Sequence, residues 1–369
     1  MPNLVLYRKY RPQTFSEIIG QEHVVKTLTN EISAGMISHA YLFSGPKGSG
    51  KTTVARLLAK AINCENPDTG YEPCNKCSSC LEITKGNAMD LIEIDAASHR
   101  GIDEIRELRE GIRFSPVRSK YKVFIIDESH QLTKDAANAL LKTLEEPPSH
   151  AVFILATTEV HKMIPTIISR CQRFDFRRLQ LSELIQKLEF IVKKEGVNFE
   201  KSALTLIALN SRGSFRDAES LMDKCISFSG RKKTITTEDI KELLGLVEIE
   251  QVFKIIDFIF KKNAKEAIIF LNKTIEEGID IQELAKSLIY YLRQSLLLKI
   301  NPDAKSSTDS GFTEEECEKI KAQSESFEME EIQKILDLFI EAENKMKYAS
   351  IPQLPLELAI IEATGLADD

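Results

Sequence analysis

The sequence predicts an α/β domain built on a parallel sheet, followed by two domains made only of helices. Short apolar runs recur between Tyr41 and Phe176, and segments with an amphipathic helical pattern lie between them. Strands that alternate with helices in this way form βαβ units, whose parallel sheet is covered on both faces. After Arg178 only helical patterns follow. The 369 residues also exceed what one hydrophobic core usually serves, so two or three domains are expected.

The expected elements give the domain bounds. The predicted strands are 41–44, 91–95, 123–127, 152–157 and 173–176. The predicted helices are 182–194, 202–209, 216–228 and 237–244, with longer helical stretches from 249 onward and a polar loop at 301–310. We therefore expect a sheet domain over 1–178, a small helical domain over 179–243 and an all-α domain over 244–369.

Composition and charge are those of an ordinary globular protein. Apolar residues make up 43% and charged residues 28% of the chain, which excludes a disordered or collagen-like protein. The N-terminal apolar run is too short for a signal peptide, and no stretch is long enough to span a bilayer. We expect a cytoplasmic protein with no membrane contact. A net charge of -7 means that any contact with nucleic acid must be local.

A phosphate-binding loop follows the first predicted strand. Residues 45–52 read Gly45-Pro46-Lys47-Gly48-Ser49-Gly50-Lys51-Thr52, which fits the P-loop pattern, and an amphipathic helical pattern comes next. The glycines let backbone N–H groups point at the phosphate oxygens of ATP, at the positive end of the helix. Lys51 would reach the β- and γ-phosphates, and Thr52 would hold Mg²⁺. The alternative is a chance glycine-rich turn, which the flanking strand and helix disfavour.

Two acidic residues end the strand at 123–127. Asp127 is expected at the C-terminal edge of the sheet, where ligands of open α/β sheets bind. There Asp127 can hold the Mg²⁺ shell, while Glu128 orients and activates water. A buried strand followed by an acidic turn is the alternative for this segment alone. The phosphate loop favours the catalytic interpretation.

Four of the seven cysteines lie close together, at Cys64, Cys74, Cys77 and Cys80. Disulfides are not expected in a chain without a secretion signal. Four thiolates suit a closed, structural Zn²⁺ site, and prolines and a glycine between them supply the necessary bends. An iron–sulfur cluster and free thiols are the alternatives. The other cysteines are expected to be unconnected buried thiols: Cys171, Cys225 and Cys317.

A series of segments carries a family resemblance: LYRKYRPQTFSEIIGQEHV at 6–24, HAYLFSGPKGSGKTTVARLLAKAINC at 39–64, LIEIDAASHRGIDEIR at 91–106, LLKTLEEPP at 140–148, ILATTE at 154–159, SRCQRF at 169–174 and GSFRDA at 213–218. In this order they resemble the AAA+ ATPases, and specifically the gamma/tau subunits of bacterial DNA polymerase III. The resemblance implies an AAA+ P-loop NTPase domain, a helical lid and an all-α collar for oligomerisation. It also implies an ATPase motor of the clamp loader, which uses ATP to load the sliding clamp onto primed DNA, with no polymerase active site of its own.

The resemblance also implies roles for single residues. Thr157 matches the sensor 1 position that feels the γ-phosphate, and Arg216 matches the sensor 2 arginine of the lid. Arg170 matches the arginine finger offered to the ATP of a neighbouring subunit, and the four clustered cysteines match the zinc module of the family. Tyr7 and Arg11 fall in a segment near the adenine. Fixed positive charge suits phosphoryl transfer, but a surface salt bridge is the alternative for each arginine.

The implied partners are the other subunits of a hetero-pentamer, the sliding clamp and primer–template DNA. Contact with DNA phosphates is expected around Ser98, His99 and Arg100 and along the helix that carries Arg106 and Arg109. An exposed helix of mixed charge is the alternative, because glutamates interleave there at Glu104, Glu107 and Glu110. The longest family members carry further C-terminal domains that bind the replicative helicase and the polymerase subunit. This chain stops after the collar, so those two contacts are in doubt.

Two other functions are compatible with parts of this pattern. Another AAA+ machine, such as a branch-migration motor or an unfoldase, would have the P-loop and the acidic pair. Such a protein would lack the cysteine array and the SRC motif at 169–171. A scaffold subunit that has lost its ATP site is disfavoured, because Lys51, Thr52, Asp127 and Glu128 are all present.

Overall fold

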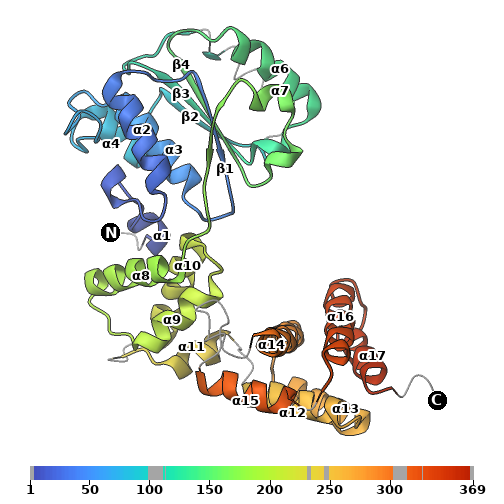
Figure 1. Cartoon of the computed structure of the whole chain (residues 1–369). Coiled ribbons are helices and arrows are strands. Elements are labelled where there is room, and N and C mark those ends of the chain that lie inside the picture. The colour runs from blue at the N-terminus through green and yellow to red at the C-terminus, as the bar shows by residue number, and fades with distance from the viewer. Residues whose placement is uncertain are drawn as a thin grey trace. The chain divides into compact units, whose positions relative to one another are not determined.

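A computed structural model describes most of the chain as two compact units (Figure 1). The first unit contains Met1–Gly196 and Asn210–Lys224, and the second contains Val197–Leu209 and Cys225–Asp369. The described residues are 4–98, 111–112, 114–230, 234–244, 249–301, 314–325 and 327–365. The three expected domains divide the chain differently, and their bounds stay a prediction.

The first unit contains a five-stranded parallel sheet with the order β2-β3-β4-β1-β5. Its strands are β1 (Ala40–Ser44), β2 (Leu91–Asp95), β3 (Lys122–Asp127), β4 (Ala151–Thr157) and β5 (Gln172–Asp175). Every residue of β1 and β4 is buried. The sequence predicted each strand to within one residue at either end. The continuous apolar runs of β1, β3 and β4 are typical of parallel strands buried on both faces, whereas the edge strands β2 and β5 are partly exposed.

Helices cover both faces of this sheet (Figure 1). On one face lie α2 (Glu22–Ala34) and α3 (Lys51–Ile62), whose apolar residues pack on Tyr41, Phe43 and the alternate residues of β3 and β4. On the other face lie α6 (Lys134–Glu145) and α7 (Pro165–Ile168), which share a core with Leu42 and the remaining strand residues. The alternation of side chains along each strand thus divides one sheet between two cores.

The second unit consists of helices around a single apolar core. Tyr291 and Phe339 are among its fully buried large side chains. Asp280 begins α14 by accepting the backbone N–H groups of Gln282 and Glu283, at 2.8 and 3.1 Å. The helices that lie wholly in this unit are α11 (Thr237–Leu244), α12 (Ile249–Phe260), α13 (Ala264–Glu276), α14 (Ile281–Ile300), α15 (Glu314–Ser324), α16 (Met329–Met346) and α17 (Leu354–Ala363).

The expected polar loop at 301–310 lies outside the described residues except for Asn301, which ends α14. Two further helices, α9 (Lys201–Asn210) and α10 (Phe215–Ser229), each contribute residues to both units. Across the described part of the chain, no helix combines the length and the apolarity that crossing a membrane requires.

An N-terminal segment packs on α8 (Leu181–Glu195) within the first unit. It contains α1 (Leu6–Lys9) and the short 3₁₀ helix η1 (Phe15–Glu17). A further described helix of this part of the chain is α4 (Ser78–Lys85), which follows the cysteine-rich loop. Lys187 of α8 donates to the carbonyl oxygen of Tyr10 at 2.9 Å, and the Tyr10 and Phe190 rings meet edge to face at 6.2 Å. Lys9 and Glu195 form an ion pair of 2.6 Å.

Two buried ionisable side chains, Lys187 and Glu219, lie close to this segment. The ammonium of Lys187 is 4.0 Å from a carboxylate oxygen of Glu219 in α10, and both side chains are about nine-tenths buried. Burial raises the pKa of Glu219 to about 7, although Lys187 and Arg11 act in the opposite direction. Burial likewise lowers the pKa of Lys187. At this separation the attraction does not offset the loss of hydration of either group.

The folded chain should lose stability as the pH rises, because Glu219 must then ionise inside the protein. Its folded pKa of about 7 lies above its ordinary value of 4.5, so its bound proton favours the folded state. That contribution is complete below about pH 4.5 and is lost as the pH rises through about 7. The loss amounts to about 3 kcal/mol at most. In Glu219→Gln, the free energy of unfolding from urea titrations should vary less with pH across this window.

Glu195→Gln is the matched control for this experiment. The hydrogen bond from Lys9 lowers the pKa of Glu195, so this partly exposed carboxylate is already ionised in the same window. The control should therefore keep the pH dependence of the wild type. An identical pH dependence in the wild type and in Glu219→Gln would contradict the prediction.

Candidate phosphate-binding site and cysteine centre

The glycine-rich loop joins β1 to α3 and is held by contacts that leave no space for a side chain at Gly45 or Gly48. The Gly45 N–H donates to the Thr157 carbonyl oxygen at 3.1 Å. Gly48 has a φ of +76°, and a Cβ atom there would lie 1.9 Å from the Ser214 hydroxyl oxygen. The Phe215 N–H donates to the Gly48 carbonyl oxygen at 3.3 Å. Glycine at position 48 thus lets the loop lie against the start of α10.

Lys51 and Thr52 begin α3, at the end of this loop. The Lys51 ammonium donates to the carbonyl oxygens of Gly45 and Pro46, each at 2.8 Å. Burial lowers the pKa of Lys51, while the nearby Glu128 and Asp127 carboxylates act to raise it. The Thr52 hydroxyl donates to Asp127 Oδ2 at 2.8 Å. The structure therefore brings the predicted phosphate ligands and the predicted acid of β3 together.

Glu128 and Thr157 lie close by, at the C-terminal ends of β3 and β4. Glu128 has a left-handed backbone, with φ +47°, and begins the 3₁₀ helix η2 (Ser129–Gln131). Its Oε2 accepts the Thr158 hydroxyl at 2.9 Å and lies 3.4 Å from His130 Nδ1. Thr157 is fully buried, with its hydroxyl oxygen 3.0 Å from the same nitrogen. The sequence analysis missed His130, whose only signal is its place directly after the acidic pair and a serine.

The N-terminal segment and α10 place three more predicted residues near the loop. The Arg216 guanidinium lies over the Tyr7 ring, 5.2 Å from its centroid. Burial lowers the pKa of Arg11, and the positive charges of Arg56 and Arg216 act in the same direction. Arg216 directly follows Phe215, whose N–H donates to the Gly48 carbonyl oxygen, so Arg216 and Tyr7 lie beside the phosphate loop.

A buried glutamine that the sequence analysis missed connects the loop to the residues after β5. The Gln21 side-chain amide donates to the carbonyl oxygens of Ser49 and Arg177, at 3.3 and 2.9 Å. Its own oxygen accepts the Arg177 N–H at 3.2 Å. Gln21 is 1% exposed, so these contacts satisfy an amide that burial would otherwise penalise.

Arg170 lies away from the other predicted residues. It precedes β5, whereas the phosphate loop follows β1, and these two strands are parallel, with Tyr41 paired to Gln172. Arg170 is therefore at the N-terminal edge of the sheet and the loop is at the opposite edge. Its guanidinium pairs with Glu145 at 2.8 Å and donates to the Thr166 carbonyl oxygen at 2.8 Å. The side chain is about a third exposed.

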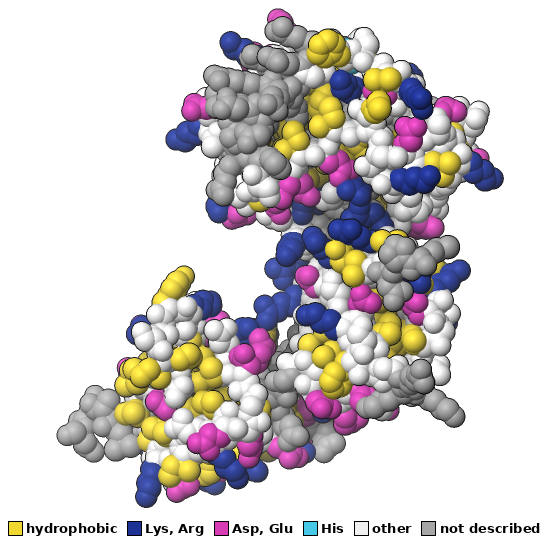
Figure 2. Space-filling view, turned by 180° about the vertical axis from the view of Figure 1, so that it is seen from behind, with side chains coloured by type: hydrophobic (Ala, Val, Ile, Leu, Met, Phe, Trp, Pro, Cys, Tyr) yellow, Lys and Arg dark blue, Asp and Glu magenta, His cyan; other side chains and the backbone are white. Residues whose placement is uncertain are grey.

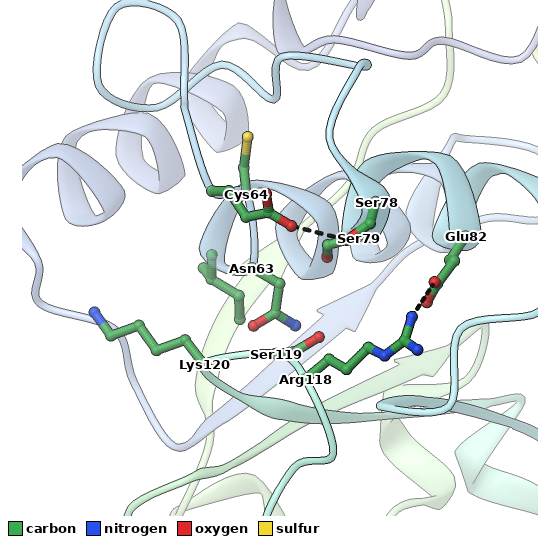
Figure 3. A pocket seen from close by; sticks show the side chains of 10 residues that line it. Asn63, Cys64, Ser78, Ser79, Glu82, Arg118, Ser119 and Lys120 are labelled. Carbon is green, nitrogen blue, oxygen red and sulfur yellow. Dashed lines mark hydrogen bonds and ion pairs between the residues drawn. The ribbon is translucent and has the colours of Figure 1, made fainter.

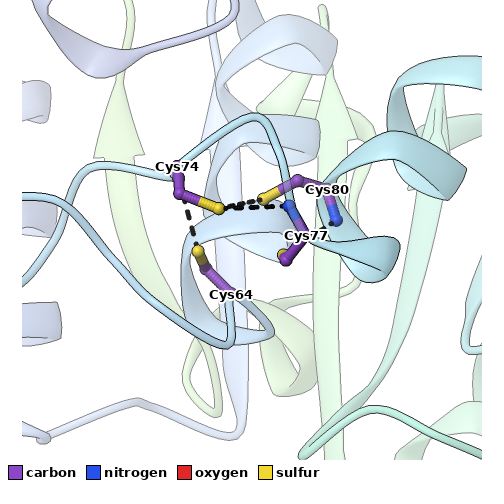
Figure 4. Close-up of side chains that lie close together, drawn as sticks. All are labelled: Cys64, Cys74, Cys77 and Cys80. Atoms are coloured by element: carbon purple, nitrogen blue, oxygen red, sulfur yellow. Dashed lines mark hydrogen bonds between the residues drawn. The ribbon is translucent and has the colours of Figure 1, made fainter.

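The four clustered cysteines converge on one point (Figure 4). Their sulfur atoms all lie within 4.8 Å of one another, and those of Cys74 and Cys80 are 4.0 Å apart. Tetrahedral Zn²⁺ with bonds of about 2.3 Å would place its sulfur ligands about 3.8 Å apart. The donor set and its spacing therefore fit a zinc ion.

Backbone N–H groups favour the thiolate at one of these cysteines. The Lys76 and Cys77 N–H groups point at Cys74 Sγ and, with the Lys76 contact as the largest cause, lower the pKa of Cys74 to about 6. Burial instead raises the pKa of Cys80. All seven cysteines are described and none forms a disulfide. Cys225 and Cys317 are buried as expected, but Cys171 is only partly buried, because β5 is an edge strand.

A small hollow beside the cysteine centre is not part of the phosphate-binding site (Figure 3). Its lining includes Asn63, Ser78 and Glu82, and the Arg118 guanidinium pairs with Glu82 at 3.3 Å. None of the predicted nucleotide ligands lines it.

The predicted DNA contacts lie mostly outside the described residues. Ser98 is described, and its hydroxyl contacts Asp95 Oδ2 at 3.2 Å. The other residues of that prediction are not described: His99, Arg100, Arg106 and Arg109. DNA contact at this segment stays a prediction.

Comparisons with known proteins cover nearly the whole chain. Residues 20–180 match a family described as DNA polymerase III, delta subunit. Residues 183–231 match the ATPase lid domain of the DNA polymerase III clamp loader subunit, and residues 235–368 match domain III of the DNA polymerase III subunits gamma and tau. Among solved structures, the RuvB Holliday junction branch migration motor of Thermotoga maritima is similar, at 22% identity and a TM-score of 0.49 over 73% of this chain and 86% of that chain.

Individual relatives agree with these matches. The chain is 42% identical to DNA polymerase III subunit tau of Bacillus subtilis over 97% of its own length, and it spans 62% of that protein. It is 41% identical to subunit tau of Escherichia coli over 81% of its own length, and it spans 46% of that protein. It is 40% identical to subunit gamma of Buchnera aphidicola subsp. Schizaphis graminum, covering 93% of this chain and 95% of that protein. The chain belongs to the family of DNA polymerase III gamma and tau subunits.

Proposed function

We propose that this chain is an ATPase motor subunit of a DNA polymerase III clamp loader in the bacterial cytoplasm. It would use ATP binding and hydrolysis to load the sliding clamp onto primed DNA during chromosomal replication. The observation that carries this proposal is the hydrogen bond of 2.8 Å between Thr52 and Asp127, which joins the phosphate loop to the acidic end of β3. A scaffold subunit would have no use for this arrangement beside an intact Lys51.

In the proposed site, residues 45–52 bind the triphosphate of ATP through backbone N–H groups. Lys51 would exchange the carbonyl oxygens of Gly45 and Pro46 for phosphate oxygens, which stabilise a buried ammonium better because they are charged. Thr52 and Asp127 would hold Mg²⁺, which neutralises charge on the phosphates. Glu128 would orient the attacking water, and Thr157 would contact the γ-phosphate.

The residues beside the loop would bind the rest of the nucleotide. Tyr7 and Arg11 would lie near the adenine, and Arg216 would contact the phosphates from α10. The contact of 5.2 Å between Arg216 and the Tyr7 ring supports a common site for the two. Gly48 and Phe215 support it further, because their backbone hydrogen bond ties α10 to the phosphate loop.

We propose that α16 and α17 supply the contacts with neighbouring subunits of a hetero-pentamer. Large apolar side chains are exposed on these helices and on the segment between them, and Figure 2 shows apolar side chains on the surface of the second unit. An exposed apolar surface of this kind is typical of subunit interfaces. Tyr348 is the most exposed of them, at 92%. The set comprises Ile340, Tyr348, Ile351, Leu354 and Leu358. The sliding clamp and DNA phosphates would be the other partners.

Lys51→Ala should abolish ATP binding and DNA-stimulated ATP hydrolysis, because no other side chain of the loop is placed to replace its charge. The fold should persist, since Lys51 makes only two hydrogen bonds to its own loop. ATP binding is measured by calorimetry, and hydrolysis is measured with the other clamp-loader subunits, the clamp and primed DNA. Lys134→Ala, which removes an exposed lysine at the start of α6, is the control and should bind and hydrolyse ATP like the wild type. Wild-type affinity in folded Lys51→Ala would contradict the nucleotide site.

We propose that the cysteine centre holds one Zn²⁺ through four thiolates. Elemental analysis of the purified protein should find about one zinc per chain. Cys77→Ser should lose most of the zinc and lower the midpoint of thermal unfolding, because metal binding is coupled to folding of the loop. Cys317→Ser, which changes a cysteine of the second unit, should keep the zinc. Stoichiometric iron, or no metal in the wild type, would refute the assignment.

We propose that Arg170 acts on the ATP of a neighbouring subunit, since it lies at the sheet edge opposite its own phosphate loop. Arg170→Ala should keep ATP binding but lose hydrolysis by a factor of about 10³ or more. Arg173→Ala, which removes an exposed arginine of β5, should hydrolyse ATP normally.

Mixed subunits give a sharper form of this test. Arg170→Ala subunits mixed with Glu128→Gln subunits should regain some activity. An interface between the two variants can combine the intact Arg170 of one subunit with the intact Glu128 of the other. Fluorescence energy transfer between labelled subunits establishes that they exchange. An isolated monomer of Arg170→Ala that hydrolyses ATP at the rate of the assembled wild type would overturn the assignment.

A further inference from the structure

A buried histidine lies between two residues that the proposed function uses for hydrolysis. His130 is the middle residue of η2, and its side chain is 6% exposed. Its Nδ1 lies 3.0 Å from the Thr157 hydroxyl oxygen and 3.4 Å from Glu128 Oε2. Its Nε2 lies 3.2 Å from a carboxylate oxygen of Glu159. The motifs described above give this imidazole no role.

The hydrogen bonds around Thr157 define what His130 accepts and donates. The Thr157 oxygen accepts the Glu159 N–H at 3.1 Å and keeps a second lone pair, so it can also accept an Nδ1–H of His130. The Glu128 carboxylate beside Nδ1 can only accept, so Nδ1 contacts both oxygens favourably when it carries the hydrogen. Nε2 faces the Glu159 carboxylate. Lys162 fixes that carboxylate by an ion pair of 2.8 Å. The ring is therefore oriented from both sides.

Glu128 is the third group in contact with this ring. The Thr158 hydroxyl holds its Oε2 at 2.9 Å, and His130 Nδ1 lies against the same oxygen. One ring nitrogen therefore contacts both the residue expected to feel the γ-phosphate and the acid expected to orient water. A change of partner at the Thr157 hydroxyl changes how the Nδ1 hydrogen is shared between Thr157 and Glu128.

We propose that His130 is a positioning residue that links the hydrogen-bond partner of Thr157 to the orientation of Glu128. The inference rests on the proposed ATPase function and adds a residue to it. In this arrangement, contact of Thr157 with a γ-phosphate readies Glu128 for hydrolysis through the imidazole. In this role His130 acts through Thr157 and Glu128 and not on the nucleotide itself, so its loss should lower the turnover number and leave ATP binding intact.

Three substitutions separate the two nitrogens of the ring. The amide of His130→Asn lies near the position of Nδ1, the amide of His130→Gln reaches toward the position of Nε2, and His130→Phe keeps a ring without hydrogen bonds. The kcat of the Phe and Gln variants should fall by about 10- to 100-fold, as for other residues that orient a catalytic group. The Asn variant should recover most of this loss. In all three, ATP affinity should match the wild type.

His161→Asn is the matched control, because His161 is exposed and lies 3.9 Å from the same Glu159 carboxylate. It should hydrolyse ATP like the wild type. The double variant His130→Phe/Thr157→Val gives an independent measurement. If the two residues act through each other, its kcat should be close to that of the more impaired single variant, instead of showing the product of both losses.

The outcomes separate this inference from the proposed function. A wild-type complex without ATPase activity would refute the proposed function itself. An active wild type together with a Phe variant of unchanged kcat would overturn only the role of His130. Equal losses in the Asn and Gln variants would also overturn it, because a merely structural histidine would not distinguish the two nitrogens. If the Phe variant does not fold, the comparison of Asn with Gln decides.

Discussion

Parallel pairing of β4 with β1 on one side and β3 on the other is the constraint on which the site depends. Since all strands run the same way, the phosphate loop after β1, the acids after β3 and Thr157 at the end of β4 meet at one edge. The register pairs Ser44 with Thr157, and the next hydrogen bond runs from the Gly45 N–H to the Thr157 carbonyl oxygen. A slip of one residue would turn the strand faces over and separate these groups.

The parallel sheet also explains why Arg170 lies far from its own phosphate loop, whereas Arg216 lies beside it. Arg170 lies before β5 and Gly45 lies after β1, so the length of the sheet separates them. Arg216 approaches from α10, which is tied to the loop at Gly48. Both arginines are expected to contact ATP phosphates, but Arg170 is positioned by the start of β5 and Arg216 by α10.

Much of this architecture could be predicted from the sequence, because it depends on local patterns. The central strands β1, β3 and β4 are continuous apolar runs, and the P-loop is a short motif between a strand and a helix. His130, Gln21 and Glu219 could not be predicted, since their environments depend on residues far along the chain. Gln21 contacts Arg177, and Glu219 lies near Lys187. A single sequence gives no sign of these contacts or of the burial that shifts the pKa of Glu219.

The close approach of Gly48 and Ser214 has a consequence for how this sequence can change. A Cβ atom at position 48 would overlap the Ser214 hydroxyl, so the space at these two positions is shared. That Cβ atom would also lie 2.7 Å from the Ser214 Cβ and 3.1 Å from its Cα, so removing the hydroxyl alone would not make room for it. Residues from distant parts of the sequence therefore constrain each other, because any side chain at position 48 would displace the start of α10.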